Sequence, residues 1–131
     1  NWRAQAIYLI KPDIRDAAAY VESRYRPGDL LVFQMPHIRY TFDYYFGPTN
    51  YLWADGLYTN DRDEQGKYLM PESFVVQWAS QVVGEHRRVW LVASEVQMWD
   101  RRNLVQRWLE RVFVRTSEAY FVRVSVYEYQ R

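Results

Sequence analysis

Stretches with apolar residues at helical spacing alternate along the chain with short runs that are wholly apolar. The first stretch opens at Pro12 and Asp13, and Asp13 stands where a side chain caps the first turn of a helix. The apolar positions of this helix are Ile14, Ala17, Ala18, Val21 and Tyr25. Pro27 and Gly28 end the helix, and residues 30–33 are then all apolar, which predicts a strand buried on both faces.

The same alternation continues as far as residue 112. We expect a helix over residues 38–46, a short strand at 51–53, a helix opening at Pro71, a buried strand at 88–94 and a helix capped by Asp100. The residues predicted to face inward on these helices are Ile38, Phe42 and Tyr45, then Phe74, Trp78 and Val82, then Leu104, Val105, Trp108, Leu109 and Val112.

The C-terminal pattern is different, because Val122, Val124 and Val126 alternate with polar residues. This alternation predicts a hairpin with one buried face and a turn near residues 117–119. Buried strands separated by amphipathic helices are typical of a parallel sheet covered on both sides. We therefore predict a single α/β domain over residues 1–131: a three-layer, Rossmann-like sandwich with a mostly parallel five-stranded sheet and a C-terminal antiparallel hairpin. The strand at 30–33 should lie near the middle, adjacent and parallel to the strand at 89–93.

Composition adds one unusual feature, a high content of aromatic residues. Phe, Trp and Tyr make up 18% of the 131 residues, and 15 of the 17 basic residues are Arg. Such rings fill a core, but at a surface they would contact a sugar, a lipid or a partner protein, and Arg stacks well on them. The net charge of +1 gives no electrostatic case for binding nucleic acid, and the absence of Cys excludes disulfides and thiolate metal sites. No apolar run reaches the roughly 18–20 residues that a membrane span needs.

Polar residues follow both predicted central strands. In an open α/β sheet, ligands bind beyond the carboxyl ends of these strands. Here His37, Arg39 and Asp43 follow the first strand and Glu95 follows the second, and together they would suit a small anionic or sugar ligand. Ordinary surface polarity at the start of a helix is the alternative. No glycine-rich phosphate-binding loop is present, so we expect no dinucleotide cofactor, no metal and no catalytic residue.

An acidic segment, Asp61-Arg62-Asp63-Glu64-Gln65-Gly66, is followed by Glu72 and comes close to a calcium-binding loop. Gln65 departs from the ligand pattern, and Pro71 stands where such a loop would already be helical. We expect an acidic, solvated loop, with a calcium site as the alternative.

Five further segments stand out together: residues 11–21 (KPDIRDAAAYV), 26–33 (RPGDLLVF), 42–46 (FDYYF), 88–92 (RVWLV) and 104–109 (LVQRWL). In these segments the chain resembles the C-terminal soluble region of bacterial membrane glycosyltransferases. The group concerned is the dolichyl-phosphate-mannose/aminoarabinose transferase-like group of the C-type glycosyltransferase superfamily. The first segment is similar to the stretch that follows the last membrane spans of these enzymes. Because the chain begins at Asn1 rather than Met, we also expect it to be a fragment of a larger protein.

The resemblance implies an extracytoplasmic accessory domain of a polytopic enzyme in the cytoplasmic membrane, soluble as an isolated fragment. The enzyme would use a polyprenyl-phosphate-linked sugar donor, and its catalytic acids lie in the membrane portion, so none is assigned here. The expected partners are the transmembrane portion and a lipid-linked sugar or acceptor glycan. The residues expected to contact the sugar are Tyr40, Tyr44, Tyr45 and Trp99, with core packing as the alternative. A self-contained small-ligand or protein-binding α/β module is the second hypothesis.

Overall fold

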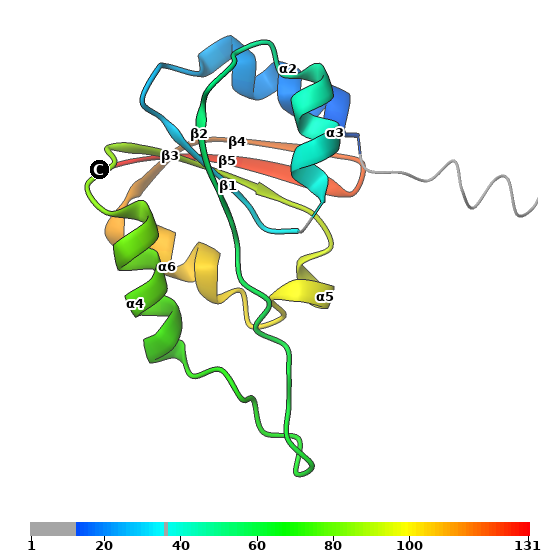
Figure 1. Ribbon diagram of the computed structural model, residues 1–131, viewed down its shortest axis with the longest axis vertical. Coiled ribbons are helices and arrows are strands. Elements are labelled where there is room, and N and C mark those ends of the chain that lie inside the picture. Colours follow the sequence, from blue (N-terminus) through cyan, green and yellow to red (C-terminus); the bar gives the residue numbers. More distant parts are fainter. Residues whose placement is uncertain (1–12, 36) are drawn as a thin grey trace, which may run out of the picture.

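The computed structural model describes residues 13–35 and 37–131 as a five-stranded sheet between helices (Figure 1). In chain order the elements are α2 (Ile14–Arg24), β1 (Leu30–Phe33), α3 (Ile38–Tyr45), β2 (Leu52–Asp55), α4 (Glu72–Val83), β3 (Arg88–Ala93), α5 (Val96–Trp99), α6 (Leu104–Val112), β4 (Val114–Phe121) and β5 (Val124–Gln130). The Asp13 side chain caps α2 by accepting from the backbone N–H of Asp16, as predicted. Pro12 lies outside the described residues. No helix within the described ranges is both long and apolar enough to cross a membrane.

The strands are arranged in the order β2-β1-β3-β5-β4. β1 pairs in parallel with β2 and β3, whereas β5 pairs antiparallel with β3 and β4. The prediction of a mostly parallel, Rossmann-like sheet is therefore wrong, because the sheet is mixed and its C-terminal end is antiparallel. The physical reason is the position of β5. The crossover from β3 through α6 leads to β4, and the hairpin then inserts β5 into the gap between β3 and β4.

The two strands predicted to be central are adjacent, parallel and buried, as expected. Leu30 pairs with Val89 and Phe33 with Val92, and no residue of β1 is more than slightly exposed. β3, rather than β1, is the middle strand. The predicted hairpin is also present, but its turn lies at residues 122–123 rather than 117–119, and Arg123 adopts a positive φ of 59° there.

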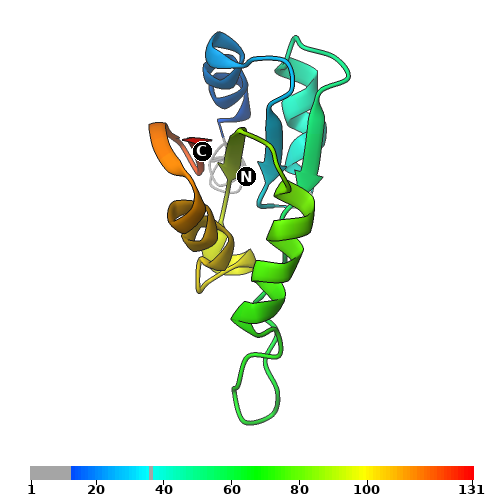
Figure 2. The ribbon, with the colours of Figure 1, turned by 90° about the vertical axis from the view of Figure 1, so that its left-hand side faces the viewer.

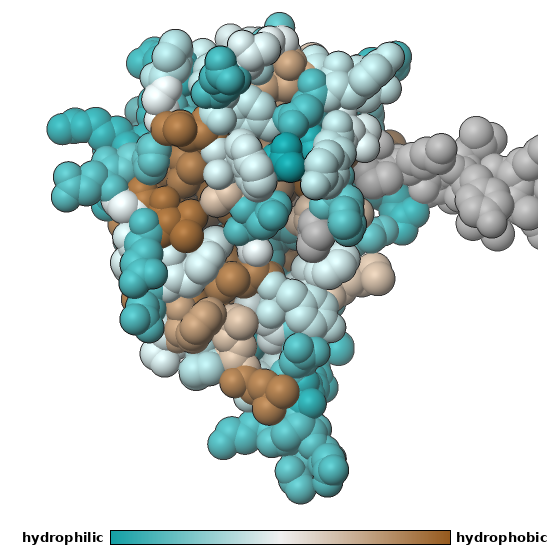
Figure 3. Space-filling model, viewed as in Figure 1, coloured by the Kyte–Doolittle hydropathy of each residue, from teal (hydrophilic) through white to brown (hydrophobic). Residues whose placement is uncertain are grey.

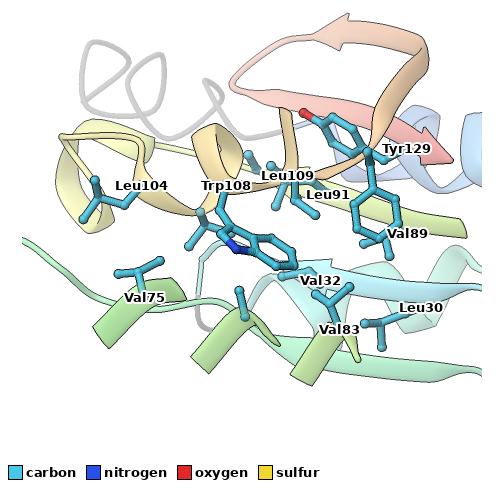
Figure 4. Packing of buried hydrophobic residues seen from close by; sticks show 14 residues of the cluster. Leu30, Val32, Val75, Val83, Val89, Leu91, Leu104, Trp108, Leu109 and Tyr129 are labelled. Carbon is cyan, nitrogen blue, oxygen red and sulfur yellow. The ribbon is translucent and has the colours of Figure 1, made fainter. Parts of the chain in front are cut away.

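Helices cover both faces of the sheet and produce two separate cores. α2 and α3 pack on the face that carries Leu31, Phe33 and Trp90, and α4 and α6 pack on the opposite face. Figure 4 shows the second core, where Trp108 of α6 lies between α4 and the strands, close to Val32. In Figure 2 the loop between β2 and α4 extends away from the layered body, beyond the end of α4.

α4 buries a different face from the one predicted. Its buried residues are Val75, Ala79 and Val83, whereas Phe74 is 47% exposed. Trp78 and Val82 pack only partly against the core. The prediction was wrong because apolar residues occupy two neighbouring faces of this helix, so spacing alone does not identify the one that meets the sheet.

The amino ends of β1 and β3 are joined by buried charges. The Asp29 carboxylate accepts hydrogen bonds from Arg88 Nε at 3.1 Å, from Trp90 Nε1 at 3.0 Å and from the backbone N–H of Arg26 at 3.1 Å. Arg88 also reaches Glu128 on β5, with an Nη2 to Oε2 distance of 2.7 Å. Asp29 and Glu128 are almost fully buried, so these bonds offset the cost of removing both carboxylates from water.

Candidate functional site

Beyond the carboxyl ends of β1 and β3, the chain turns toward opposite faces of the sheet. From β1 the chain enters α3 on one face of the sheet, and from β3 it enters α5 and α6 on the other. Such a switch point is where open α/β sheets bind ligands. The backbone is strained just beyond both strands, because His37 has φ 73° and Glu95 has φ 51°. Residues other than Gly rarely adopt this left-handed conformation.

Buried Gln34 forms the floor of this region. Its backbone N–H donates to Val92 O at 2.9 Å, and its side-chain Nε2 donates to Leu57 O at 2.8 Å, which ties β1 to β3 and to the chain beyond β2. Gly56 is required here, since a Cβ on it would collide with the Gln34 amide. The Gln34 Oε1 atom is buried without a hydrogen-bond partner among the described residues.

A row of stacked side chains runs from this switch point to the edge of the sheet. The His37 and Tyr40 rings are stacked with centroids 6.2 Å apart. The Arg39 guanidinium lies 4.6 Å from the centroid of Tyr40 and 3.8 Å from that of Trp53 on β2. We call these four residues, Trp53, Arg39, Tyr40 and His37, the aromatic–arginine row. It brings three predicted site residues together with one that was not predicted.

The Asp43 carboxylate accepts two hydrogen bonds and neutralises the charge of the row. Arg39 Nη1 donates to Asp43 Oδ2 at 3.0 Å, one helical turn along α3. The Tyr51 hydroxyl donates to the other oxygen of Asp43. Burial raises the pKa of Tyr51, and its bond to the Asp43 carboxylate raises it further, so the hydroxyl remains a donor at neutral pH. The guanidinium is therefore already balanced by a carboxylate.

Glu95 faces a different neighbour from the one predicted. Its Oε1 accepts from Arg123 Nη2 at 2.8 Å, and Ser94 Oγ donates to Arg123 O at 2.5 Å, so both residues contact the hairpin turn. Beside them is an open groove of about 570 Å³ between α5 and the hairpin. Its lining includes Glu95, Val96, Met98, Tyr120, Arg123 and Ser125.

The remaining predicted residues lie apart from the row. Trp99 packs edge-on against Tyr58, with centroids 5.5 Å apart, beneath the loop between β2 and α4. Tyr44 and Tyr45 contact each other on the outer surface of α3, and Tyr45 also borders a shallow hollow beside α2. The structure thus distributes the predicted residues over four places: the row, the α5 groove, the contact of Trp99 with Tyr58 and the outer surface of α3.

Trp53 is the residue that the sequence did not reveal. It lies in a short apolar segment that reads as a strand, and a Trp in a strand is usually assigned to the core. In the structure β2 is an edge strand, and its parallel pairing of Trp53 with Leu31 places the ring on the α3 face. The available signal was Arg39, whose side chain suits stacking between rings.

Two carboxylates of the calcium-like segment, Asp63 and Glu72, are already engaged with groups of the protein. Asp63 Oδ1 accepts from the backbone N–H groups of Gln65 and Lys67, both at 2.9 Å, and Glu72 pairs with Arg111 of α6 at 3.0 Å. Among residues 13–35 and 37–131 there is no group of three or more acidic or His side chains placed to hold a metal ion.

The geometry therefore suits binding by contact more than proton transfer, because Asp43 and Glu95 are both engaged with arginines. No protein-family model matches this chain, and no curated protein matches it significantly.

Proposed function

We propose that this chain is a non-catalytic accessory domain of a membrane glycosyltransferase that uses a polyprenyl-phosphate-linked sugar donor. The domain would lie at the extracytoplasmic face of the cytoplasmic membrane. The observation that carries the proposal is how α3 divides the aromatic segment 42–46. Phe42 and Phe46 are buried, whereas Tyr44 is 83% exposed and Tyr45 is also exposed. The segment that resembles the transferases therefore both anchors α3 and presents rings outward.

The buried half of this segment explains how α3 is held. Phe42 packs against Phe33 of β1 with centroids 5.1 Å apart and against Phe46 at 4.8 Å. This packing orients the helix, so the outward tyrosines stand on a rigid support rather than on a mobile loop. Exposed aromatic side chains held in this way are typical of surfaces that contact another molecule.

A role without catalysis follows from where the chemistry must occur. A polyprenyl-phosphate donor stays in the bilayer, so its reacting carbon lies at the membrane surface, where an acid or base must be within hydrogen-bond reach. Two carboxylates on the segments that follow β1 and β3, Asp43 and Glu95, are bonded to Arg39 and Arg123. We infer that the domain forms a wall beside the transferase site and contacts donor or acceptor.

One observation favours a second candidate function, a self-contained small-ligand module. The groove beside α5 combines apolar walls with the Glu95–Arg123 ion pair, as ligand sites commonly do. A small molecule that binds the isolated chain at this groove, and not at α3, would favour this second candidate.

The test is transfer of a labelled sugar from a short-chain polyprenyl-phosphate donor. We expect transfer by the full-length protein, none by this chain alone, and reduced transfer by a full-length Tyr44→Ala, Tyr45→Ala variant. Turnover by the isolated chain would contradict the accessory role. Absence of transfer by the full-length protein over a panel of donors would contradict the assignment to a transferase.

A further inference from the structure

We propose that the aromatic–arginine row binds the uncharged hexopyranose units of a glycan, with Trp53 and Tyr40 each supporting a sugar ring. This inference names the ligand class of the domain, and its importance for sugar transfer rests on the proposed function. The binding itself depends only on the geometry of α3 and β2.

The exposure of the row shows which atoms are available to a ligand. Tyr40 is 65% exposed and Trp53 is 42% exposed, whereas the Arg39 side chain between them is only 19% exposed. The guanidinium is thus largely covered by the two rings and acts as a spacer that holds them. The open surface belongs to the rings, and they come from two different elements, α3 and β2.

A hexopyranose complements this surface chemically. One face of the sugar ring is lined by C–H groups and loses unfavourable contact with water when it covers an aromatic ring. Its hydroxyl groups lie around the rim and need donors and acceptors close by. Asp43, whose side chain is partly open to solvent, provides acceptor oxygens beside the rings.

The charge of the row favours an uncharged ligand. Arg39 is the one arginine or lysine of the row, and the Asp43 carboxylate balances its charge at 3.0 Å. A phosphate would have to compete with that carboxylate, and it would lie close to the negative charge of Asp43. Tyr51 holds the Asp43 carboxylate in place, since the Tyr51 hydroxyl donates to the second oxygen of that carboxylate.

The surrounding surface is also unlike a lipid-binding one. In Figure 3 the part of this face over α2 and α3 is mostly white and teal, and the brown apolar side chains gather mainly lower and to the left. Among the exposed aliphatic residues, Leu69, Val76 and Met98 lie elsewhere along the chain, and Leu52, next to Trp53 on β2, pairs with Leu30 and so faces the opposite side of the sheet. Rings with polar groups beside them, and with the neighbouring Leu52 turned to the other face of β2, fit a sugar better than an acyl chain.

The experiment is calorimetric titration of the chain with two uncharged probes, mannohexaose and the hexamer of N-acetylglucosamine. We expect saturable binding of at least one probe, with affinity about five- to tenfold weaker in Trp53→Ala and in Tyr40→Ala, since each removes one stacked ring. Trp53→Phe keeps a ring and should retain affinity within about threefold. Phe74→Ala removes an equally exposed ring from the opposite face of the sheet and should leave affinity unchanged.

Three outcomes would overturn the inference. These outcomes are no binding of either probe by the wild-type chain, equal loss in Phe74→Ala, or tighter binding of mannose 1-phosphate than of mannose. Binding of vesicles of anionic lipid that is weakened by Trp53→Ala would assign the row to a membrane instead. Far-ultraviolet circular dichroism of each variant separates lost binding from lost folding. Sugar transfer by the full-length protein is measured separately, so a transferase that works normally with Trp53→Ala would overturn the role of the row in transfer and leave the proposed function intact.

Discussion

The two ends of the same pair of strands, β1 and β3, have opposite properties. At their amino ends, Asp29 and Glu128 are buried and every oxygen of these carboxylates accepts a hydrogen bond or an ion-pair contact. At their carboxyl ends, His37 and Glu95 have left-handed backbones, and the Gln34 Oε1 atom is buried without a partner among the described residues. The buried polar groups at the amino ends are thus fully hydrogen-bonded, whereas the carboxyl ends combine strained backbone with a buried oxygen that has no partner among the described residues.

This difference separates stability from function within one sheet. Buried charges that are fully paired hold the strands and helices in register, and they leave no group free for a ligand. Strained backbone and exposed rings cost stability and are retained where they serve a contact. We therefore expect substitutions at the amino end to change the free energy of unfolding, and substitutions at the carboxyl end to change binding.

The largest expected effect is that of Glu128→Gln. It removes a buried charge bonded to Arg24 at 3.0 Å and to Arg88 at 2.7 Å, and leaves Arg88 facing Asp29 alone. The free energy of unfolding should fall by about 3 kcal/mol, as for other broken buried ion pairs. Urea denaturation measures this value. The control Glu118→Gln, on the exposed side of β4, should change it by less than about 0.5 kcal/mol; equal effects would contradict the assignment of stability to the amino end.

The next largest expected effect is on how the stability of the protein depends on pH. Burial alone would raise the pKa of Glu128, but hydrogen bonds from Ser117 and Arg24 and the charge of Arg88 outweigh burial and lower it. The unfolded chain therefore binds more protons, so the contribution of Glu128 is fully present above about pH 4.5 and is lost as pH falls through the lower folded pKa. Unfolding measured from pH 7 to 3 should show a smaller loss for Glu128→Gln than for the wild type. Identical slopes would show that Glu128 does not contribute.

A smaller effect is expected from relieving strain at the carboxyl end. His37→Gly removes a left-handed conformation that costs roughly 1–2 kcal/mol for a residue with a side chain, partly offset by the freedom that Gly loses on folding. Stability should rise by roughly 0.5–1 kcal/mol in thermal or urea unfolding. Asn50→Gly, at φ 57° in the turn before β2, is the control and should gain less, because Asn tolerates this conformation. A loss of stability in His37→Gly would mean that the strain is not there.

The smallest expected effect is that of calcium. Asp63 already accepts two backbone hydrogen bonds, and Glu72 is paired with Arg111, so calcium would have to break both arrangements. We expect titration calorimetry to detect no micromolar binding and thermal unfolding to be unchanged by calcium. Micromolar binding that Asp61→Ala abolishes would contradict this expectation.

The sequence predicted the parts of the fold that depend on local pattern. Continuous apolar runs identified β1 and β3, because strands buried on both faces cannot alternate. The insertion of β5 between β3 and β4 was not predictable in this way, since the same alternating valines fit a hairpin at any edge of the sheet. The face of α4 was misjudged for a similar reason, as Phe74 and Val75 are both apolar.

The site was predicted only in part, because its contacts join distant segments. His37, Arg39 and Tyr40 were identified from their position after a central strand, and in the structure these three side chains lie together in the row. Trp53 joins them through β2, 14 positions after Arg39 (53 minus 39), and spacing does not reveal such a contact. The pairing of Glu95 with Arg123 likewise depends on where the hairpin turns.

The most direct test of the central claim is nuclear magnetic resonance mapping of a mannohexaose titration onto the chain. We predict that the largest shifts occur at the Trp53 indole N–H and at the backbone amides of Arg39 and Tyr40. Amides around Asp29 and Glu128, at the opposite ends of the strands, should not change. Shifts centred on the amino ends of β1 and β3, on the α5 groove or nowhere in the spectrum would contradict the claim that the aromatic–arginine row is the sugar-contacting surface.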